Sequence, residues 1–250
     1  MAADRLEGTE LDTVGAGLAH RLLPVLEGGP DTGLSEDAFN DLALEIFRYQ
    51  VQANPVFGAF CRGRGIGPGD VDHWTRIPAV PTSAFKAVPL VSGDPGAAQA
   101  TFHTSGTTRG TEGRGVHRIL DLRLYHAALL SSFRAFLLPD GARLPLLSLI
   151  PTPERVPDSS HSHMMGVVRD QLSLPGGGTF VDPDAGLDAR AFLASLERHR
   201  ESRQPVLIAG TAFSFVHWLD SPEARRLSGV LPEGSRIMET GGFKGRSRVI

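Results

Sequence analysis

The sequence predicts an α/β fold with a largely parallel sheet flanked by helices. Residues 144–150 form a continuous apolar run of strand length, and residues 206–209 form a shorter one. Strands of a parallel sheet read this way because helices bury both of their faces. Helical patterns over residues 121–138, 187–200 and 212–219 separate such runs, and this alternation of strands and helices indicates the fold class.

The shorter strands are marked by β-prone residues next to turns. Residues 178–181 and 236–239 are predicted strands, and residues 100–103 and 116–120 flank a segment rich in glycine and hydroxyl side chains. The last pair therefore predicts two strands joined by a polar loop.

The amino-terminal third is expected to be mostly helix and loop. Residues 1–34 are glycine-rich and weakly periodic, so we expect a loosely structured segment with a short helix near residues 18–26. The folded domain is expected to span residues 35–250, starting with a helix capped by Ser35. Its expected apolar face comprises Phe39, Leu42, Ala43, Ile46 and Phe47. Asn54-Pro55 should end that helix, because the residue before proline avoids helical backbone angles.

The composition excludes several classes of protein. The chain has 250 residues, 41% of them hydrophobic and 21% charged, which is ordinary for a soluble globular protein. A net charge of -3 gives no reason to expect nucleic-acid binding. No apolar stretch is long enough to span a membrane, and no secretion signal is visible, so we expect a cytoplasmic protein.

The single cysteine excludes an intramolecular disulfide and any metal site built on several cysteines. Cys61 is a conceivable acylated nucleophile, but we favour an inert, small hydrophobic residue. His161 and His163 are two apart, so on a strand they would share a face. Two histidines without a third ligand are weak evidence of a metal site, and we predict none.

The most informative segment runs from His103 to Gly110 and is followed by Arg114-Gly115-Val116. Glycines allow backbone N–H groups to converge, and hydroxyls and an arginine add donors that fit phosphate oxygens. The segment is not a Walker A loop, because Val116 stands where that motif needs lysine. An ordinary polar hairpin turn is the alternative.

The order of these residues resembles the phosphate-binding loop of adenylate-forming enzymes, which include acyl-CoA synthetases, adenylation domains and luciferases. Arg109 stands where that family usually has glycine, and Arg114 where it usually has lysine. A second segment, residues 238–246, resembles LuxE-type acyl-protein synthetases, the ligases that activate long-chain fatty acids in bacterial luminescence. Segments 81–86, 159–164 and 206–213 are also similar to that family.

This resemblance implies that a carboxylic acid, in the LuxE type a long-chain fatty acid, reacts with ATP to give an acyl-adenylate and pyrophosphate. The acyl group would then pass to a protein thiol. Mg2+ would accompany ATP, held mostly by phosphate oxygens and water, so no protein metal ligand is assigned. An acyl-transferase or reductase is the partner protein that the resemblance implies.

The resemblance also assigns residues to roles. Hydroxyls and amides of the loop would bind the β- and γ-phosphates, its glycines would permit close approach, and Arg114 would offset the charge of pyrophosphate. Gly241 and Gly242 would lie against adenine, and His163 near the carboxylate. The loop residues assigned to ATP are Thr104, Ser105, Gly106, Thr107, Thr108 and Gly110.

Structural alternatives stay open for several of these residues. Gly241 and Gly242 also fit a tight turn after a strand, and Glu239 and Lys244 also fit an exposed ion pair. The charged stretch 197–203 is most simply a solvated helix end.

The main departure from the family lies after residue 246. Adenylate-forming enzymes continue with an aromatic-Gly-x-Thr-Glu segment, a ribose-binding aspartate and a small C-terminal domain with a catalytic lysine. We therefore expect this chain to hold only the N-terminal part of such an enzyme. Two alternatives are kept: an aryl- or acyl-CoA ligase of the phenylacetate type, and a non-catalytic nucleotide-binding module.

Overall fold

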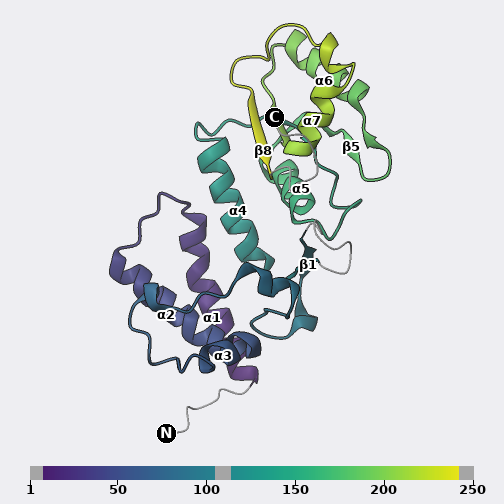
Figure 1. The fold of residues 1–250 in the computed structure, drawn as a ribbon. Helices are drawn as coiled ribbons and strands as arrows, with labels where there is room; N and C mark the ends of the chain where they lie inside the picture. The colour runs from purple at the N-terminus through teal and green to yellow at the C-terminus, as the bar shows by residue number, and fades with distance from the viewer. Residues whose placement is uncertain (1–7, 105–113, 242–250) are drawn as a thin grey trace. The chain divides into compact units, whose positions relative to one another are not determined.

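The computed structural model describes residues 8–104 and 114–241 (Figure 1). The chain divides into two compact units, residues 1–132 and 133–250. Each unit is described by itself. Both the helical elements and the parallel sheet of the predicted α/β fold are present, the sheet lying wholly in the second unit.

The first helix of unit 1 corrects the expectation of a loose segment with a short helix. Helix α1 runs over Gly8–Glu27, and its Leu18 and Ala19 are buried. A side chain on Gly15 would approach the Tyr49 hydroxyl to 2.6 Å, so glycine allows α1 to pack closely on the next helix. Gly15 and the other glycines of α1 lower its helix propensity. The sequence pattern therefore did not indicate the full length of the helix.

Helix α2 (Glu36–Ala53) begins where the sequence predicted, with the Ser35 hydroxyl accepting a hydrogen bond from the Ala38 amide at 3.2 Å. Its buried side chains include Leu44, Phe47 and Val51. Phe39, expected on the apolar face, is instead 44% exposed and contacts the Trp74 ring edge-on. The buried face of α2 is therefore rotated relative to the apolar face that the sequence spacing predicted.

Asn54 ends α2 and starts a further helix that the sequence reading missed. Its side chain accepts a hydrogen bond from the Phe57 amide, and Pro55 occupies the first turn of α3 (Pro55–Arg62). Proline suits this position because the first helical amide has no intrahelical partner. Helices α2 and α3 enclose one hydrophobic core of unit 1, which also contains Cys61.

The rest of unit 1 is short turns and one hairpin. The turns are η1 (Trp74–Arg76), η2 (Thr82–Lys86) and η3 (Pro95–Ala97). Strands β1 (Ala100–His103) and β2 (Val116–Ile119) pair antiparallel, as the β-prone segments predicted. Helix α4 (Leu122–Leu137) follows.

Unit 2 contains a four-stranded parallel sheet in the order β4-β3-β7-β8, which confirms the predicted sheet. Strand β3 is buried at all five positions. The helices that alternate with these strands are α5, α6 and α7, and β5 and β6 form a small hairpin. The bounds are β3 (Pro145–Leu149), α5 (Ser160–Leu172), β4 (Leu174–Thr179), β5 (Val181–Asp182), β6 (Gly186–Leu187), α6 (Ala189–Glu201), β7 (Leu207–Thr211), α7 (Ala212–Asp220), η5 (Ala224–Arg226) and β8 (Arg236–Thr240).

The helices cover opposite faces of this sheet. Side chains of α6 and α7 pack with Leu147, Leu149 and Ile208 in one core, whereas α5 faces Leu146 and Ser148 across a hollow on the other face. This follows from strand order, since the chain moves from β3 to β4 on one side and then returns past β3 to β7. Right-handed crossovers in opposite directions place their helices on opposite faces.

The strand order therefore reverses between β3 and β7. In open parallel sheets, ligands bind beyond the carboxyl ends of the strands at such a reversal point. We use the term carboxyl edge for the edge of the sheet where β3, β4, β7 and β8 end.

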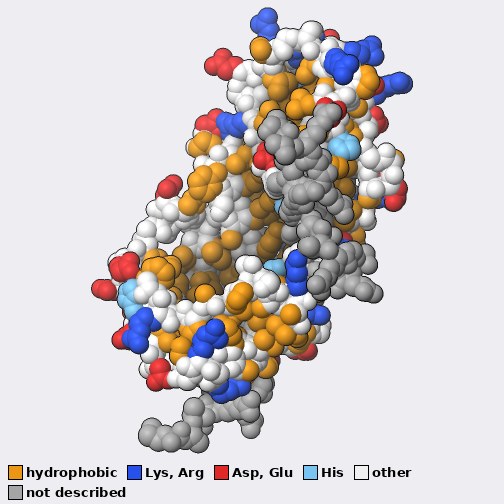
Figure 2. Space-filling view, in the orientation of Figure 1, with side chains coloured by type: hydrophobic (Ala, Val, Ile, Leu, Met, Phe, Trp, Pro, Cys, Tyr) orange, Lys and Arg blue, Asp and Glu red, His pale blue; other side chains and the backbone are white. Residues whose placement is uncertain are grey.

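Four basic residues of unit 2 lie at the opposite edge of the sheet. Arg198 and Arg200 lie in the last turn of α6, and Arg225 and Arg226 lie in η5, which precedes β8. Figure 2 shows Lys and Arg side chains around α6 at this end of the unit. They form a solvated helix end, as the sequence indicated, and lie away from the carboxyl edge.

Strand β4 depends on a glycine that touches its neighbour. A Cβ on Gly177 would lie 2.2 Å from the carbonyl oxygen of Leu146 in β3.

We expect Gly177→Ala to lower the free energy of unfolding by about 1–3 kcal/mol, because β4 must move away from β3. Urea denaturation followed by circular dichroism measures this. Gly69→Ala is the control, because a methyl group there meets no atom within 4 Å; equal midpoints for the two variants would contradict the prediction.

An ion pair ties β8 to the end of α4. Arg236 donates to Asp140 Oδ2 at 2.5 Å and to the Leu137 carbonyl at 2.6 Å. The hydrogen bond from Arg236, and next that from the Ala142 amide, hold the pKa of Asp140 below its usual value. A lowered folded-state pKa stabilises the fold above the unfolded value, near 3.9, and this contribution is lost as pH falls through the folded value.

We therefore expect Asp140→Asn to destabilise the protein near neutral pH, and the difference from the native chain to vanish in acid. Urea unfolding between pH 7 and pH 2 measures the difference. Asp31→Asn, which removes an exposed carboxylate, serves as the control. A loss of stability that stays constant down to pH 2 would refute the ion-pair explanation.

Candidate functional site

The β1–β2 hairpin closes on a pair of residues that we term the neck, Thr104 and Gly115. The Thr104 amide donates to the Gly115 carbonyl, and the Gly115 amide donates to Thr104 Oγ1, both at 2.8 Å. Arg114 Nε donates to the Thr104 carbonyl, also at 2.8 Å. The neck thus brings together Thr104 and Arg114, two residues that the sequence assigned to phosphate binding.

The chemistry of the neck suits an anion. Thr104 Oγ1 accepts one hydrogen bond and keeps its own hydrogen to donate. Arg114 is half-buried and permanently charged. Ser105, Gly106, Thr107, Thr108 and Gly110, the remaining predicted phosphate ligands, lie outside the described residues, as does Gly242.

The structure gives a steric reason for the glycine after Arg114. Gly115 is buried, and a Cβ there would lie 3.3 Å from the Phe85 carbonyl oxygen and equally close to the Thr104 side chain. Segment η2 is therefore packed against the neck, a proximity that the sequence alone did not reveal.

The second group of predicted residues lies at the carboxyl edge of unit 2. Helix α5 begins there, and the Ser159 hydroxyl caps it by accepting from the Ser162 amide at 3.2 Å. The first turn of α5 has no acidic residue, so the positive end of the helix dipole is not offset by a carboxylate of that turn. Such a helix end favours a bound anion.

The two histidines lie on this helix and not on a strand. Residues two apart on a helix point to different sides, so His161 and His163 do not share a face as they would on a strand. His161 Nε2 and Thr240 Oγ1 form a hydrogen bond of 3.0 Å, which joins α5 to the end of β8. His163, the residue assigned from the resemblance, is half-buried one turn into α5.

His161 is thus a site residue that the sequence reading gave no role. The signal for it was available: Ser159 is a good N-cap, and Ser162, Met165, Gly166 and Leu172 recur with helical spacing. Within residues 8–104 and 114–241, no three His, Cys, Asp or Glu side chains are grouped so that they could hold a metal ion.

Gly241 turns the chain away at the end of β8. Its φ is +84°, a left-handed conformation that L side chains rarely adopt, and a Cβ would meet no atom within 4 Å. Glycine is required here by backbone conformation and not by crowding. The tight-turn alternative for Gly241 therefore fits the geometry, and the turn leaves its backbone exposed at the carboxyl edge.

The described residues of unit 2 line hollows that include a pair of about 510 Å³ each. One lies between α5 and the glycine-rich strand β4, and its lining includes Arg169. The other is lined almost wholly by apolar side chains of α6, α7 and β8, with Glu239 as its charged group. Ile237 and Leu219, which line it, are 61% and 66% exposed, and Figure 2 shows hydrophobic side chains on the surface of unit 2.

Cys61 is fully buried in the core of unit 1, and burial raises the pKa of its thiol. The thiolate is the nucleophilic form, so burial works against acylation. The structure therefore agrees with the interpretation of Cys61 as a small hydrophobic residue.

No protein-family model matches the chain, and neither curated proteins nor solved structures give a match. None of the helices in the described parts of the chain is long and apolar enough to cross a membrane. Function is therefore inferred from the residues and their geometry.

We expect Thr104→Val to open the neck, because valine leaves the buried Gly115 amide without its acceptor. An unsatisfied buried donor costs about 1–3 kcal/mol, so the Gly115 amide should exchange with deuterium at least about tenfold faster in NMR spectra. Thr104→Ser keeps the acceptor and should exchange like the native chain. Thr101→Val on β1 is the matched control, and unchanged exchange in Thr104→Val would contradict this account of the neck.

Proposed function

We propose that the chain belongs to an ATP-dependent ligase that activates a carboxylic acid as its acyl-adenylate, in the manner of LuxE-type acyl-protein synthetases. The observation that carries the proposal is the neck, where Thr104 and Arg114 are held together at the mouth of a loop of glycines and hydroxyls. A fixed cation beside a hydroxyl donor is an arrangement that suits the binding of phosphate oxygens.

In this proposal the loop binds the β- and γ-phosphates of ATP. Donors fixed in advance stabilise charge that develops on the pyrophosphate as it leaves. Arg114, which follows the loop in sequence, supplies positive charge, and its bond to the Thr104 carbonyl fixes the guanidinium. Mg2+, held by phosphate oxygens and water, would neutralise further charge.

The reaction requires little covalent help from the protein. A carboxylate oxygen attacks the α-phosphorus, forming a C–O–P bond, and the bond between the α-phosphorus and the bridging oxygen breaks to release pyrophosphate. Positioning of the two reactants is then the main contribution of the chain.

Unit 2, taken by itself, has features that suit a carboxylic acid. The amino end of α5, with His161 and His163, offers partial positive charge for a carboxylate. The apolar hollow beside α7 is within the usual size of ligand sites, so it suits a fatty tail.

A second function fits the same neck, because binding phosphates there does not require that an acid is also activated. It is a non-catalytic module that binds nucleotide. Transfer to coenzyme A, as in ligases of the phenylacetate type, is a variant of the first proposal that differs only in acceptor.

The test is release of pyrophosphate from ATP and Mg2+ with a panel of fatty and aryl acids. We expect acid-dependent release that falls at least about a hundredfold in the double variant Thr107→Ala, Thr108→Ala, because loop donors typically contribute that much each. Thr101→Ala is the control. Addition of coenzyme A distinguishes the aryl-CoA variant by its thioester product.

Each outcome identifies one alternative. ATP binding that the double variant weakens, without pyrophosphate release, would favour the nucleotide-binding module. Absence of ATP binding by the native chain would refute the phosphate-loop interpretation.

A further inference from the structure

The apolar hollow of unit 2 has a buried floor and an exposed rim. Its floor includes Phe192, Ile208 and Trp218, which are buried. Its rim includes Leu219 and Ile237, which are 66% and 61% exposed. A hydrocarbon group that covers these side chains removes apolar surface from water, which is favourable. The volume of about 510 Å³ lies within the usual range of small-molecule sites.

Glu239 adds a charge to this apolar wall. Ile237 and Glu239 both line the hollow, since residues two apart on a strand point to the same face. Arg236 lies on the other face of β8, where it is bonded to Asp140 and to the Leu137 carbonyl. Among the described residues, no ion pair or hydrogen bond engages the exposed Glu239 side chain. Its carboxylate can therefore pair with a cation that a ligand brings.

A glycine beside Glu239 gives this end of the hollow an aromatic wall. Gly210 of β7 is the register partner of Glu239 in the sheet. A Cβ on Gly210 would lie 3.0 Å from the Phe215 ring and 3.1 Å from Leu149 Cβ. Glycine therefore allows Phe215, which also lines the hollow, to pack on β7 at the position that pairs with Glu239. Phe215 and Trp218 supply aromatic rings, whose faces attract cations.

These features favour one kind of head group on a ligand. A hydrocarbon wall accepts any tail of suitable size, so the charge in the wall decides which head group binds. Glu239 repels a carboxylate, whereas Glu239 and the aromatic rings attract an ammonium. The tail of a fatty acid fits the same wall, and the inference concerns the head group that Glu239 favours.

We propose that this hollow is a binding site for an amphiphilic amine. The hydrocarbon part of the ligand fills the hollow, and its ammonium lies beside Glu239. The site is built wholly from unit 2 and uses neither ATP nor the neck of unit 1, so it does not rest on the proposed function.

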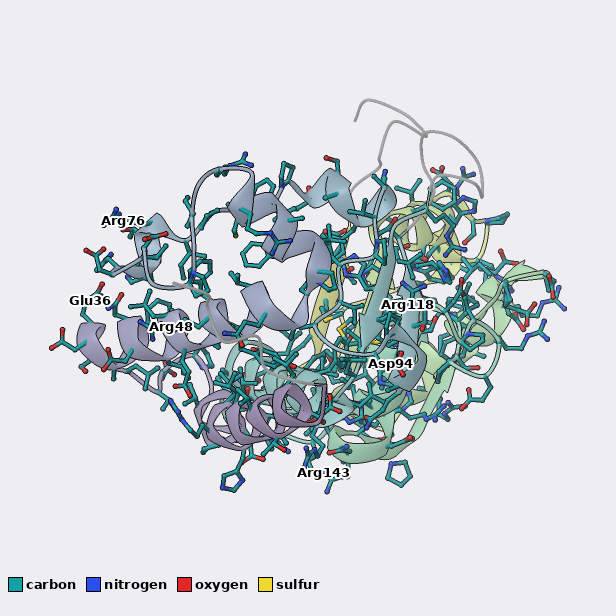
Figure 3. All side chains as sticks on the ribbon, turned by 90° about the horizontal axis from the view of Figure 1, so that it is seen from below. Glu36, Arg48, Arg76, Asp94, Arg118 and Arg143 are labelled. Atoms are coloured by element: carbon teal, nitrogen blue, oxygen red, sulfur yellow. The ribbon has the colours of Figure 1, made fainter. Side chains whose placement is uncertain are left out.

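Tryptophan fluorescence tests the proposal. The sequence has two tryptophans, and Trp218 lines the hollow. Trp74 belongs to unit 1, where its Nε1 donates at 2.9 Å to Glu36, at one end of α2 (Figure 3). In the Trp74→Phe variant, emission therefore reports on the hollow through Trp218. The probes are n-decylamine, n-decanol and n-decanoate, titrated at neutral pH below the concentrations at which they form micelles.

We expect decylamine to bind at least about fivefold more tightly than decanoate, with decanol between them. In the same background, Glu239→Gln should weaken decylamine binding about twofold to fivefold, the contribution of an exposed ion pair, and leave decanol unchanged. Glu201→Gln removes an exposed carboxylate from the last residue of α6, outside the hollow, and is the matched control.

A rim variant locates the site. Leu219→Ser should weaken binding of all three probes, because it removes apolar surface that the tail covers. Since Leu219 is 66% exposed, the fold should persist, and circular dichroism checks this.

Each outcome supports or overturns the inference. Selectivity for decylamine that Glu239→Gln abolishes and Glu201→Gln preserves would support it. Equal affinities for the three probes, or tighter binding of decanoate, would overturn the amine assignment. Unchanged Trp218 emission with every probe, or affinities that Leu219→Ser does not alter, would overturn the site. No titration contains ATP, so failure of acid activation leaves these results unaffected.

Discussion

Strand β3 has no face open to water, and the architecture of unit 2 depends on this constraint. All five of its residues are buried, so both faces must be covered and both edges paired. Strands β4 and β7 pair with the two edges of β3 through backbone hydrogen bonds. Helix α5 lies toward one face and α6 with α7 covers the other. The reversal of strand order beside β3 is therefore a consequence of burying it, and it places the ends of several segments at one edge.

The hairpin of unit 1 combines the burial of Phe102 with close packing and hydrogen bonds at the neck. Gly115 is enclosed by Thr104 and Phe85, and the short hydrogen bonds of the neck form because no side chain separates the strands there. The hydrogen bond from Arg114 Nε to the Thr104 carbonyl holds these two residues side by side. A binding site that is partly ordered before the ligand arrives loses less conformational entropy when the ligand binds.

Periodicity predicted the buried strands β3 and β7 of unit 2, because buried strands carry their pattern in hydrophobicity alone. Periodicity misplaced β4, which was predicted at residues 178–181 and runs over Leu174–Thr179, because its proline and glycines carry no such pattern. It failed for α1 and α5, whose glycines, serines and histidines interrupt that pattern although capping and close packing stabilise the helices. Phe39 was misplaced since spacing gives a helix face but not which neighbour covers it.

The neck was predictable from its motif, which placed Thr104 and Arg114 in one hairpin. The contact of η2 with that neck could not be predicted. Phe85 and His117 are far apart in sequence, and the stacking of two rings produces no periodic pattern in the sequence. For the same reason, the bond between His161 and Thr240 could not be read from either segment alone.

Burial of Cys61 has a consequence for the order of events in the proposed reaction. The only sulfur nucleophile in the sequence lies in a hydrophobic core. A thioester formed by this chain therefore needs a thiol that another molecule or segment brings. In the proposed reaction, the arrival of that thiol would then set the rate of turnover, because the thiol of this chain is buried.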